Sequence, residues 1–437
     1  MDFNLYILLK FMKVKVKKSE VSGKFFIPTS KSHTIRAIFF ATLASGESKI
    51  YFPLISADTN SAMEVCKGFG ASISYNENKK FLTIKGTEGK PNLPENVLDV
   101  GNSGTTLRIG VSTASLIDGY TIFTGDHQIR NRPLEGLIYA LNNLGAWVVS
   151  AKNNGKAPVI IKGKAKGGKT DLKAVTSQYL TSLLINAPLF ENNTEIIVTI
   201  LNEKPYVEMT LKWLDMLNIK YENENFKKFY IYGNQNYKNF EFTIPGDFSS
   251  ASFILVLGAL SKNKIILENM DMEDIQGDKR VVYILKDMGA EVNIFKNEKR
   301  IEISGGKLFG MKIDMNDIPD ALPIMAVAGC FAEGETHLLN VPQARLKETD
   351  RIKVMHNELK KMGANIEELE DGLIIKKSNL KGCNVDSNFD HRVAMALTIA
   401  GLFADGETII NNAEAVNVTF PNFFDSLKKA NALIEEI

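Results

Sequence analysis

The sequence contains few of the residues that build metal centres, disulfide frameworks or redox sites. Its 437 residues include three cysteines and five histidines. Cys66, Cys330 and Cys383 lie far apart and match no zinc-ligand or redox-pair spacing. Cys66 and Cys330 fall in apolar helical patterns, so we expect both in the core. Such cysteine usage is typical of a reducing compartment, and we expect a cytoplasmic protein without a bound metal.

The sequence also lacks an excess of charge of one sign and a long hydrophobic run. Lysine and arginine (52) nearly balance aspartate and glutamate (51), so no global positive field favours nucleic acid or an anionic membrane. No run reaches the roughly 20 apolar residues that a membrane span requires. Residues 1–11 are apolar but have neither a basic start nor a small-residue cleavage site, so they are not typical of a signal peptide. We interpret them as an extension or a misassigned start, because residues 12–16 resemble a first strand.

What the sequence does contain is typical of a large globular protein. Apolar residues make up 44% and charged residues 24% of the chain. A chain of 437 residues is too long for one ordinary hydrophobic core, so we expect two domains. Because the net charge is close to zero, any anion-binding site must be local.

Two signals each recur six times, about every seventy residues. In the first, a helical pattern ends at a glycine or asparagine before a short strand; these residues tolerate the left-handed conformation that ends helices, and they lie at positions 70, 145, 218, 289, 363 and 431. In the second, a helix of small apolar residues precedes a polar turn and a strand; residues 328–336 and 400–408 match almost residue for residue. If the two signals were only common turn patterns that recur by chance, they would not keep a constant offset from each other along the chain. We therefore predict six α/β units with two helices each, three per domain.

Many of the predicted helices begin with side chains that suit an anionic ligand. The stretch 345–351 holds Arg345, Lys347, Glu348, Asp350 and Arg351 directly before an amphipathic helical pattern. Free backbone N–H groups and the helix dipole favour an anion there, and arginine binds carboxylates and phosphates with two parallel hydrogen bonds. A single mixed-charge helix start is usually only a solvated face. Because such helix starts recur along the chain, a shared anion-binding cleft is the favoured interpretation. The other helix starts of this kind lie in residues 28–36, 99–108, 130–135, 175–179, 244–250, 314–320 and 390–392.

The mixture of charges at these helix starts indicates the chemistry of the cleft. The glycine-containing stretch 99–108 is neither a Walker loop nor a dinucleotide-binding fingerprint. If the helix starts converge, Asp320 and Glu348 are two carboxylates among many cations, which makes them the best candidates for proton carriers. This composition is typical of a site for two small anionic substrates.

The motifs, in their order along the chain, resemble those of the 5-enolpyruvylshikimate-3-phosphate synthase family. The resemblance extends over about residues 28–421, and Lys347-Glu-Thr-Asp-Arg351 and Gly101-Asn-Ser-Gly-Thr105 are its most specific parts. It implies an α/β fold of the α+β type, a two-domain inverse α/β barrel with six βαβαββ repeats, three per domain. The domains would be residues 12–29 plus 245–437 and residues 30–244, with 1–11 as an extension. Hinges near residues 29 and 244 would let the domains close over the substrates.

The resemblance implies a reaction: transfer of the enolpyruvyl group of phosphoenolpyruvate to the 5-hydroxyl of shikimate 3-phosphate. Addition precedes elimination of phosphate, and the product serves chorismate and aromatic amino-acid biosynthesis. No metal and no other cofactor is implied, and the enzyme would be a cytoplasmic monomer whose partners are its two small-molecule substrates. Asp320 would take the 5-hydroxyl proton, Glu348 would help to protonate the methylene carbon, and Lys31 would share in catalysis.

The resemblance also assigns binding residues, by position. The residues implied for shikimate 3-phosphate are Lys31, Ser32, Arg36, Thr176, Ser177, Gln178, Tyr206, Asp320, Gln343 and Lys347. The residues implied for phosphoenolpyruvate are Lys31, Gly104, Arg132, Gln178, Arg351 and Arg392.

Three positions depart from the family pattern. Val418 stands where the family has a lysine that contacts phosphoenolpyruvate, and Glu203 where it has a phosphate-binding serine. Gln343 replaces an asparagine, which is a tolerable exchange of amides. A buried Glu203 would repel the 3-phosphate, so we expect its side chain to point to solvent.

The valine at position 418 leads to a prediction about inhibition by glyphosate. Without the charge of the lysine, we expect glyphosate to bind this protein more weakly than it binds family members that keep the lysine. Val418→Lys should then lower the inhibition constant for glyphosate in a phosphate-release assay. Similar inhibition constants for the wild type and the variant would refute the prediction.

Two other interpretations stay open at this point. UDP-N-acetylglucosamine enolpyruvyl transferase shares the fold and the donor but uses a loop cysteine or aspartate as its acid. No cysteine here lies in a glycine-rich loop, and the motif at 347–351 is foreign to that enzyme. The second interpretation is a non-catalytic anion-binding protein on the same fold, since fold does not settle function. The presence of both Asp320 and Glu348 argues against it.

Overall fold

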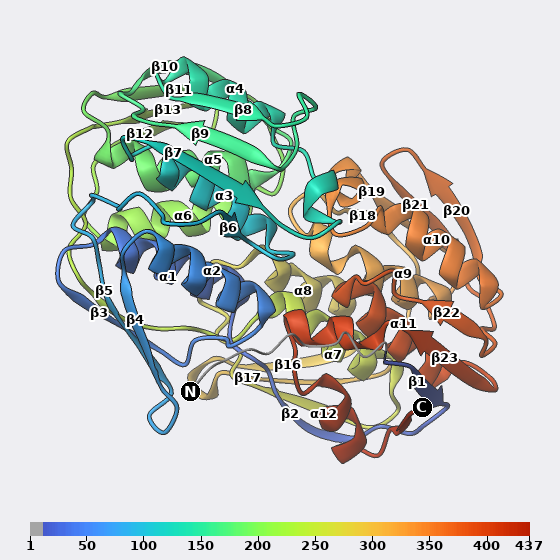
Figure 1. The fold of residues 1–437 in the computed structure, drawn as a ribbon. Coiled ribbons are helices and arrows are strands. Elements are labelled where there is room, and N and C mark those ends of the chain that lie inside the picture. Colours follow the sequence, from blue (N-terminus) through green and yellow to red (C-terminus); the bar gives the residue numbers. More distant parts are fainter. Residues whose placement is uncertain (1–11) are drawn as a thin grey trace.

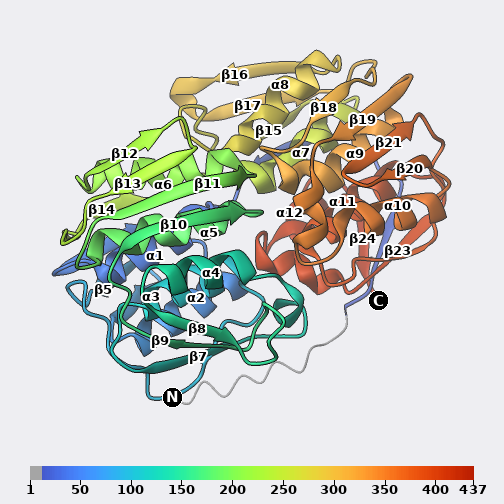
Figure 2. The ribbon, with the colours of Figure 1, turned by 90° about the horizontal axis from the view of Figure 1, so that it is seen from above.

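In the part of the chain that the structure describes, the strands form six sheets of four strands each (Figures 1 and 2). The structure is a computed structural model and describes residues 12–437, so the predicted extension at residues 1–11 lies outside the described residues. In strand order, three of the sheets are β14 (Glu241–Thr243), β3 (Glu47–Tyr51), β5 (Phe81–Lys85) and β4 (Ser72–Asn76); β6 (Leu98–Asp99), β7 (Tyr120–Thr124), β9 (Val159–Lys162) and β8 (Trp147–Ser150); and β10 (Gly168–Ala174), β11 (Thr194–Leu201), β13 (Lys228–Ile231) and β12 (Tyr221–Glu224). The other three are β2 (Gly23–Phe26), β15 (Ile265–Glu268), β17 (Arg300–Ser304) and β16 (Glu291–Phe295); β18 (Lys312–Asp314), β19 (Glu335–Leu339), β21 (Gly372–Lys376) and β20 (Asn365–Leu369); and β22 (Asn384–Asp386), β23 (Glu407–Asn411), β1 (Val14–Lys17) and β24 (Leu433–Glu436).

All six sheets share one pairing pattern. The first two strands of each sheet, in the order given, run parallel, and the remaining neighbours run antiparallel. This repetition confirms the six α/β units that the sequence periodicity predicts.

Each unit contributes one buried helix and one amphipathic helix. Apart from the polar and charged residues near their N-terminal ends, the buried helices are mostly apolar or small on all sides, which is why they pack inside. They are α1 (Lys31–Leu43), α3 (Gly104–Ala114), α5 (Ser177–Asn186), α7 (Phe248–Leu260), α9 (Leu322–Phe331) and α11 (His391–Phe403). The amphipathic set buries one stripe of side chains; it comprises α2 (Ala57–Gly68), α4 (Glu135–Asn143), α6 (Lys204–Met216), α8 (Arg280–Asp287), α10 (Arg351–Lys361) and α12 (Phe423–Lys429).

The residues that end the amphipathic helices adopt the conformation predicted for them. Gly70, Gly145, Gly289 and Gly363 have φ between 90° and 113°, and the asparagines at positions 218 and 431 have φ of 58° and 72°. Glycine reaches this left-handed region without a Cβ clash, and asparagine tolerates it better than most residues. The helix ends therefore have the same local cause in all six units.

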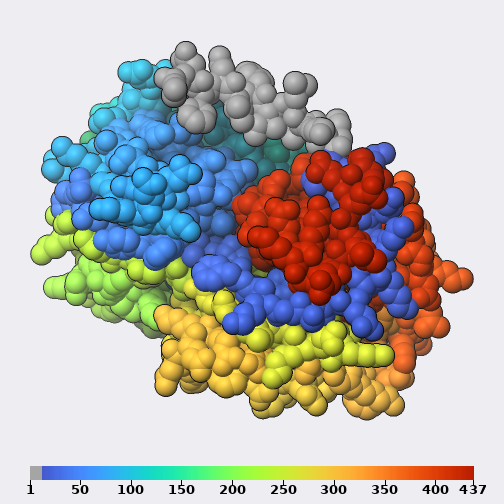
Figure 3. All heavy atoms as spheres, turned by 90° about the horizontal axis from the view of Figure 1, so that it is seen from below, coloured from blue at the N-terminus to red at the C-terminus, as the bar shows by residue number. Residues whose placement is uncertain are grey.

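Three sheets are completed by strands from distant parts of the chain. Strand β14 pairs with β3, β2 pairs with β15, and β1 inserts between β23 and β24. Figure 3 shows the blue N-terminal segment lying against the red C-terminal residues. The N-terminal strands thus belong with the C-terminal half of the fold.

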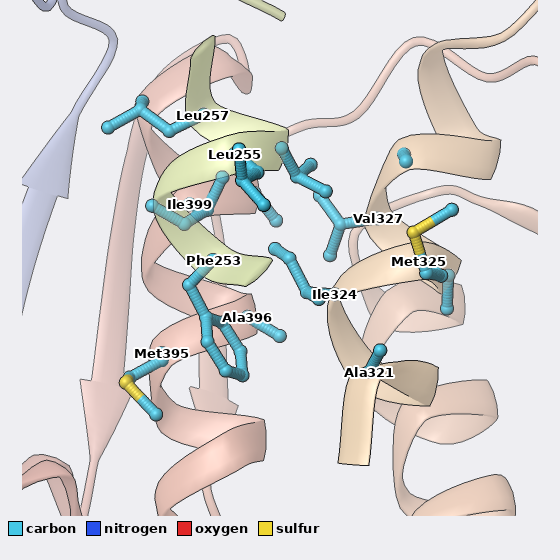
Figure 4. Close-up of a cluster of buried hydrophobic side chains, with 14 of the residues drawn as sticks. Phe253, Leu255, Leu257, Ala321, Ile324, Met325, Val327, Met395, Ala396 and Ile399 are labelled. Carbon is cyan, nitrogen blue, oxygen red and sulfur yellow. The ribbon is translucent and has the colours of Figure 1, made fainter. Parts of the chain in front are cut away.

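The buried apolar residues form two separate clusters. One draws on residues 35–244 and the other on residues 14–27 and 248–432. In the second cluster, side chains from α7, α9 and α11 point toward one another, among them Phe253, Ile324 and Ile399 (Figure 4).

Between the clusters the two connecting segments lie side by side: Thr29 and Gly246 form an antiparallel bridge, and the Ser30 N–H donates to the Pro245 carbonyl at 2.8 Å.

Two smaller expectations can be compared with the structure. Cys66 and Cys330 are buried in the core, as predicted. Among residues 12–437, no helix has both the length and the apolar character needed to cross a lipid bilayer.

Candidate active site

One cavity lies where the N-terminal ends of seven helices meet, among the described residues. Residues from the starts of α1, α2, α3, α5, α6, α10 and α11 line it, together with the loop 343–348, and it encloses about 770 Å³ of space, part of it open to solvent. The helix starts therefore converge, as the sequence pattern predicts. The predicted site residues on its wall are Lys31, Ser32, Arg36, Gly104, Arg132, Thr176, Ser177, Gln178, Tyr206, Asp320, Gln343, Lys347, Glu348 and Arg351.

Arg392 is the predicted residue that lies behind the cavity wall. Its side chain is buried, and its Nη2 donates to Asp320 Oδ2 at 3.0 Å. Its Nε and Nη1 have no hydrogen-bond partner among the described residues. A buried guanidinium with free donors is costly unless an anion completes it, which is what a substrate phosphate or carboxylate would do.

Polar side chains cap the helices that converge on the cavity. Ser103 accepts from the Thr106 N–H of α3, and Asp390 accepts from the Arg392 N–H of α11 at 2.8 Å. Asp350 caps α10 and accepts from the Lys353 N–H at 3.0 Å. These caps set where each helix begins and hence where its first residue meets the cavity.

Asp320 lies in the short turn Pro319–Ala321 before α9 and is surrounded by cations. Its Oδ1 accepts from Arg351 Nη1 at 2.8 Å and lies 3.8 Å from Lys347 Nζ, while its Oδ2 accepts from Arg392 and, at 3.3 Å, from the Tyr206 hydroxyl. Burial by itself raises the pKa of Asp320, but the charges of Arg392, Lys347 and Arg351 outweigh burial and hold that pKa well below its usual range. Asp320 is therefore ionised in the substrate-free protein.

Glu348 joins the two halves of the structure through arginines. Arg132, from the segment before α4, lies 3.0 Å from Glu348 Oε1, and Arg351 donates to Glu348 Oε2 at 2.6 Å. Burial raises the pKa of Glu348, and the two arginines lower it by more, to well below its usual range. Glu348 can act as an acid only after Arg132 and Arg351 pair with another anion, because its pKa then rises.

Gly104 permits the closest approach in this part of the site. A Cβ at this position would lie 2.5 Å from Arg132 Nη1 and 2.6 Å from Arg108 Nη1. Only glycine lets two guanidinium groups lie against the first residue of α3. The two arginines and the helix N-terminus together form a strongly anion-attracting surface.

Glu203 contradicts the expectation that its side chain points to solvent. The side chain is 1% exposed, and it lies on the cavity wall. Its Oε2 accepts from the Thr176 hydroxyl at 3.1 Å, the Ser177 N–H at 3.0 Å and the Ser177 hydroxyl at 2.7 Å, and its Oε1 pairs with Lys347. The expectation was wrong because the hydroxyl, N–H and ammonium donors that would bind a phosphate also stabilise a buried carboxylate.

Several wall residues escaped the sequence reasoning. Asp58, at the start of α2, pairs with Lys31 at 3.0 Å, a contact that depends on how α1 and α2 pack and has no local sequence signal. Arg108 lies in the predicted helix start 99–108, four residues after Gly104, but was assigned no role. The wall residues to which the sequence assigned no binding or catalytic role are Asp58, Thr105, Arg108, Pro133, Glu203, Leu346 and His391.

A second buried carboxyl, Asp278, lies next to the site. Its Oδ2 accepts from Tyr206 at 3.2 Å and from Ser249, while its Oδ1 has no partner among the described residues. Burial, followed by the nearby charge of Asp320, raises the pKa of Asp278 to about 6. At neutral pH, ionisation of Asp278 therefore lowers the stability of the folded state.

This cost predicts that Asp278→Asn stabilises the protein in a pH-dependent way. A carboxyl whose pKa is higher in the folded than in the unfolded chain weakens the fold as pH rises from 3.8 towards about 6, and the penalty is complete above that. We expect the variant to gain roughly 3 kcal/mol at most in the free energy of unfolding above the raised pKa, and little below 3.8. Denaturant titrations across this range measure the gain, and an equal gain at both ends would contradict the prediction.

The fold is that of the enolpyruvyl transferases of known structure. The enolpyruvyl transferase NikO from Streptomyces tendae superposes with a TM-score of 0.78 at 15% identity, covering 98% of this chain and 99% of that one; at this identity the likeness concerns the fold alone. An EPSP synthase from Acinetobacter baumannii superposes with a TM-score of 0.81 at 28% identity, covering 98% of this chain and 100% of that one.

Sequence relatives narrow the class to one family. The family model for EPSP synthase (3-phosphoshikimate 1-carboxyvinyltransferase) matches residues 15–427. A 3-phosphoshikimate 1-carboxyvinyltransferase from Acetivibrio thermocellus is 60% identical over 421 residues, covering 96% of this chain and 99% of that protein. One from Methanocaldococcus jannaschii is 45% identical over 426 residues, covering 96% and 98%. The chain belongs to the EPSP synthase family.

Proposed function

We propose that this chain transfers the enolpyruvyl group of phosphoenolpyruvate to the 5-hydroxyl of shikimate 3-phosphate and releases phosphate. The observation that carries the proposal is the pairing of two carboxylates, Asp320 and Glu348, with arginines in one cavity. Two dianionic substrates need many cations, and proton transfer needs carboxylates beside them. The family relationship supports the choice of substrates.

The positions of the cations support a division of the cavity between the substrates. Phosphoenolpyruvate would lie against Arg132, Arg351 and Arg392, beside Gly104 and Gln178. Shikimate 3-phosphate would lie between α1 and α5, with Lys31, Ser32 and Arg36 on one side and Thr176, Ser177, Gln178, Tyr206, Gln343 and Lys347 on the other.

Substrate binding would adjust the acidity of both carboxylates. In the substrate-free protein the cations hold both pKa values low, which makes Asp320 a weak base and Glu348 a poor acid. When substrate anions attract Arg132, Arg351 and Lys347, each carboxylate loses part of its compensating charge, and its pKa rises. Asp320 then takes the 5-hydroxyl proton as the 5-oxygen bonds to phosphoenolpyruvate, and Glu348, which gains a proton from solvent as its pKa rises, helps to protonate the methylene carbon. The tetrahedral intermediate then loses phosphate and one proton of the new methyl group, which restores the enol double bond.

Phosphate release on mixing the purified protein with both substrates tests the function. Release that requires both shikimate 3-phosphate and phosphoenolpyruvate supports the proposal. Release with UDP-N-acetylglucosamine as acceptor would indicate the sister enzyme, and no release with either acceptor would indicate a binding protein. Among the described residues, none of the three cysteines lines the cavity, so the sister enzyme's cysteine form of the acid has no counterpart on this wall, and the acceptor test decides between the two enzymes.

The remaining expectations are part of the same proposal. We place the domain boundaries at residues 12–29 plus 245–437 and 30–244, because the two hydrophobic clusters divide there. The monomeric state and the cytoplasmic location stay predictions from the sequence.

A further inference from the structure

Glu203 has surroundings that resemble a bound anion more than a structural carboxylate. Its four contacts come from a helix N-terminus and a lysine: Thr176 and Ser177 begin α5, and Lys347 precedes α10. A helix N-terminus with two hydroxyls and an ammonium group is a general binding site for a phosphate or carboxylate. In this structure the chain's own carboxylate occupies that site.

The carboxylate is ionised and firmly held. Burial raises the pKa of Glu203, but Lys347 and Ser177 outweigh burial and leave that pKa below its usual value. The backbone of Glu203 also adopts φ 59° and ψ 43°, a left-handed conformation that is unfavourable for a residue other than glycine. That conformation directs the side chain into the cavity, where it is 1% exposed.

The proposed function assigns the same donors to the substrate. Thr176, Ser177 and Lys347 are the groups expected to bind the phosphate-bearing acceptor. A phosphate and the Glu203 carboxylate cannot share them, because two anions at hydrogen-bond distance from the same donors repel each other strongly in a buried site.

We propose that Glu203 is an internal competitor of the acceptor's phosphate, which occupies the phosphate-binding donors in the substrate-free enzyme and leaves them when the acceptor binds. This inference rests on the proposed function. Glu203 lies in the half of the fold built on the hydrophobic cluster of residues 35–244, and Lys347 lies in the half built on the other cluster. The Glu203–Lys347 pair therefore also connects the two halves before substrate binds. Its release returns a cation and three donors to the phosphate.

Two substitutions of Glu203 test the competition by direct binding. Glu203→Ser removes the competing carboxylate, and Glu203→Gln keeps its shape without its charge. We expect the Kd of shikimate 3-phosphate, measured by calorimetry on the full chain, to fall at least about tenfold in the serine variant and by less in the glutamine variant. Shikimate, which lacks the phosphate, does not compete with Glu203, so its Kd should stay within about twofold.

A neighbouring carboxylate supplies the matched control. Glu208 lies one turn further along α6 and pairs with Lys204 at 3.5 Å, away from the cavity wall. Glu208→Gln removes the same charge from the same helix and should leave both dissociation constants unchanged. If the serine variant does not fold, the isosteric glutamine variant carries the test.

The outcomes separate this inference from the proposed function. An unchanged or higher Kd of shikimate 3-phosphate in both variants overturns the inference, as does an equal fall for shikimate and its phosphate. A wild type that releases phosphate while the variants bind no more tightly refutes the inference alone. A wild type that binds shikimate 3-phosphate but releases no phosphate with phosphoenolpyruvate refutes the proposed function, and the Kd comparison still decides the role of Glu203.

Discussion

Replacing Asp320 with asparagine should lower the rate of phosphate release by about 10³-fold or more. Asparagine keeps the shape of the side chain and can accept a hydrogen bond from Arg351 or from Arg392, but not from both, and it cannot take a proton from the 5-hydroxyl. The measurement is the steady-state rate at saturating concentrations of both substrates, so that weaker binding does not enter. Asp320→Ala should abolish release as well, and it also removes the hydrogen bonds.

The control for this prediction is a carboxylate of the same type elsewhere. Asp287 is exposed at the end of α8 and does not line the cavity. Asp287→Asn should release phosphate at the wild-type rate. An Asp320→Asn enzyme that folds normally and keeps more than about a tenth of the wild-type rate would show that another group takes the proton.

Replacing Arg351 with glutamine should destabilise the protein and abolish activity together. Arg351 is 1% exposed and contacts three carboxylates, those of Asp320, Glu348 and Asp390, at 2.6 to 2.8 Å. Removing it leaves buried negative charges facing one another, and breaking a buried ion pair in this way costs about 3–5 kcal/mol. Denaturant unfolding measures the loss of stability, and phosphate release measures the loss of activity.

The pH dependence identifies the cause of that loss. Arg351 helps to hold the pKa values of Asp320 and Glu348 low, and the stability that such carboxylates contribute is present above their unfolded pKa and disappears as pH falls. The difference between the wild type and Arg351→Gln should therefore shrink towards acidic pH. Arg280, which is partly exposed and lies 3.6 Å from Asp317, provides the control: Arg280→Gln should cost less than about 1 kcal/mol. A comparable cost for both arginines would contradict the explanation from burial.

Local features of the fold could be predicted because they have local causes. A helix end needs a residue that tolerates positive φ, and the glycines and asparagines at the six helix ends provide it. An apolar helix must be buried, so the small-residue pattern of α9 and α11 indicated core helices. The helix-start motifs named most of the cavity wall for the same reason, since each motif is read within about one helical turn.

Residues that depend on a distant partner could not be predicted in this way. Asp58 reaches the cavity only because α1 and α2 pack together, and the pKa of Asp278 is raised only because the fold buries it and places the charge of Asp320 nearby. Glu203 shows the limit most clearly. Its charge was visible in the sequence, but its direction depended on donors at the start of α5, 26 or 27 residues away, and on Lys347, 144 residues away.

The sequence by itself determined the six-unit repeat, the helix boundaries and the identity of most groups that line the cavity, because capping, periodicity and backbone preference act over a few residues. Only the tertiary structure decided which charges face one another across the cavity. Arg132 with Glu348 and Lys347 with Glu203 join residues that are remote in the chain. Ion pairing and burial depend on distance in space, and a one-dimensional pattern does not contain that distance.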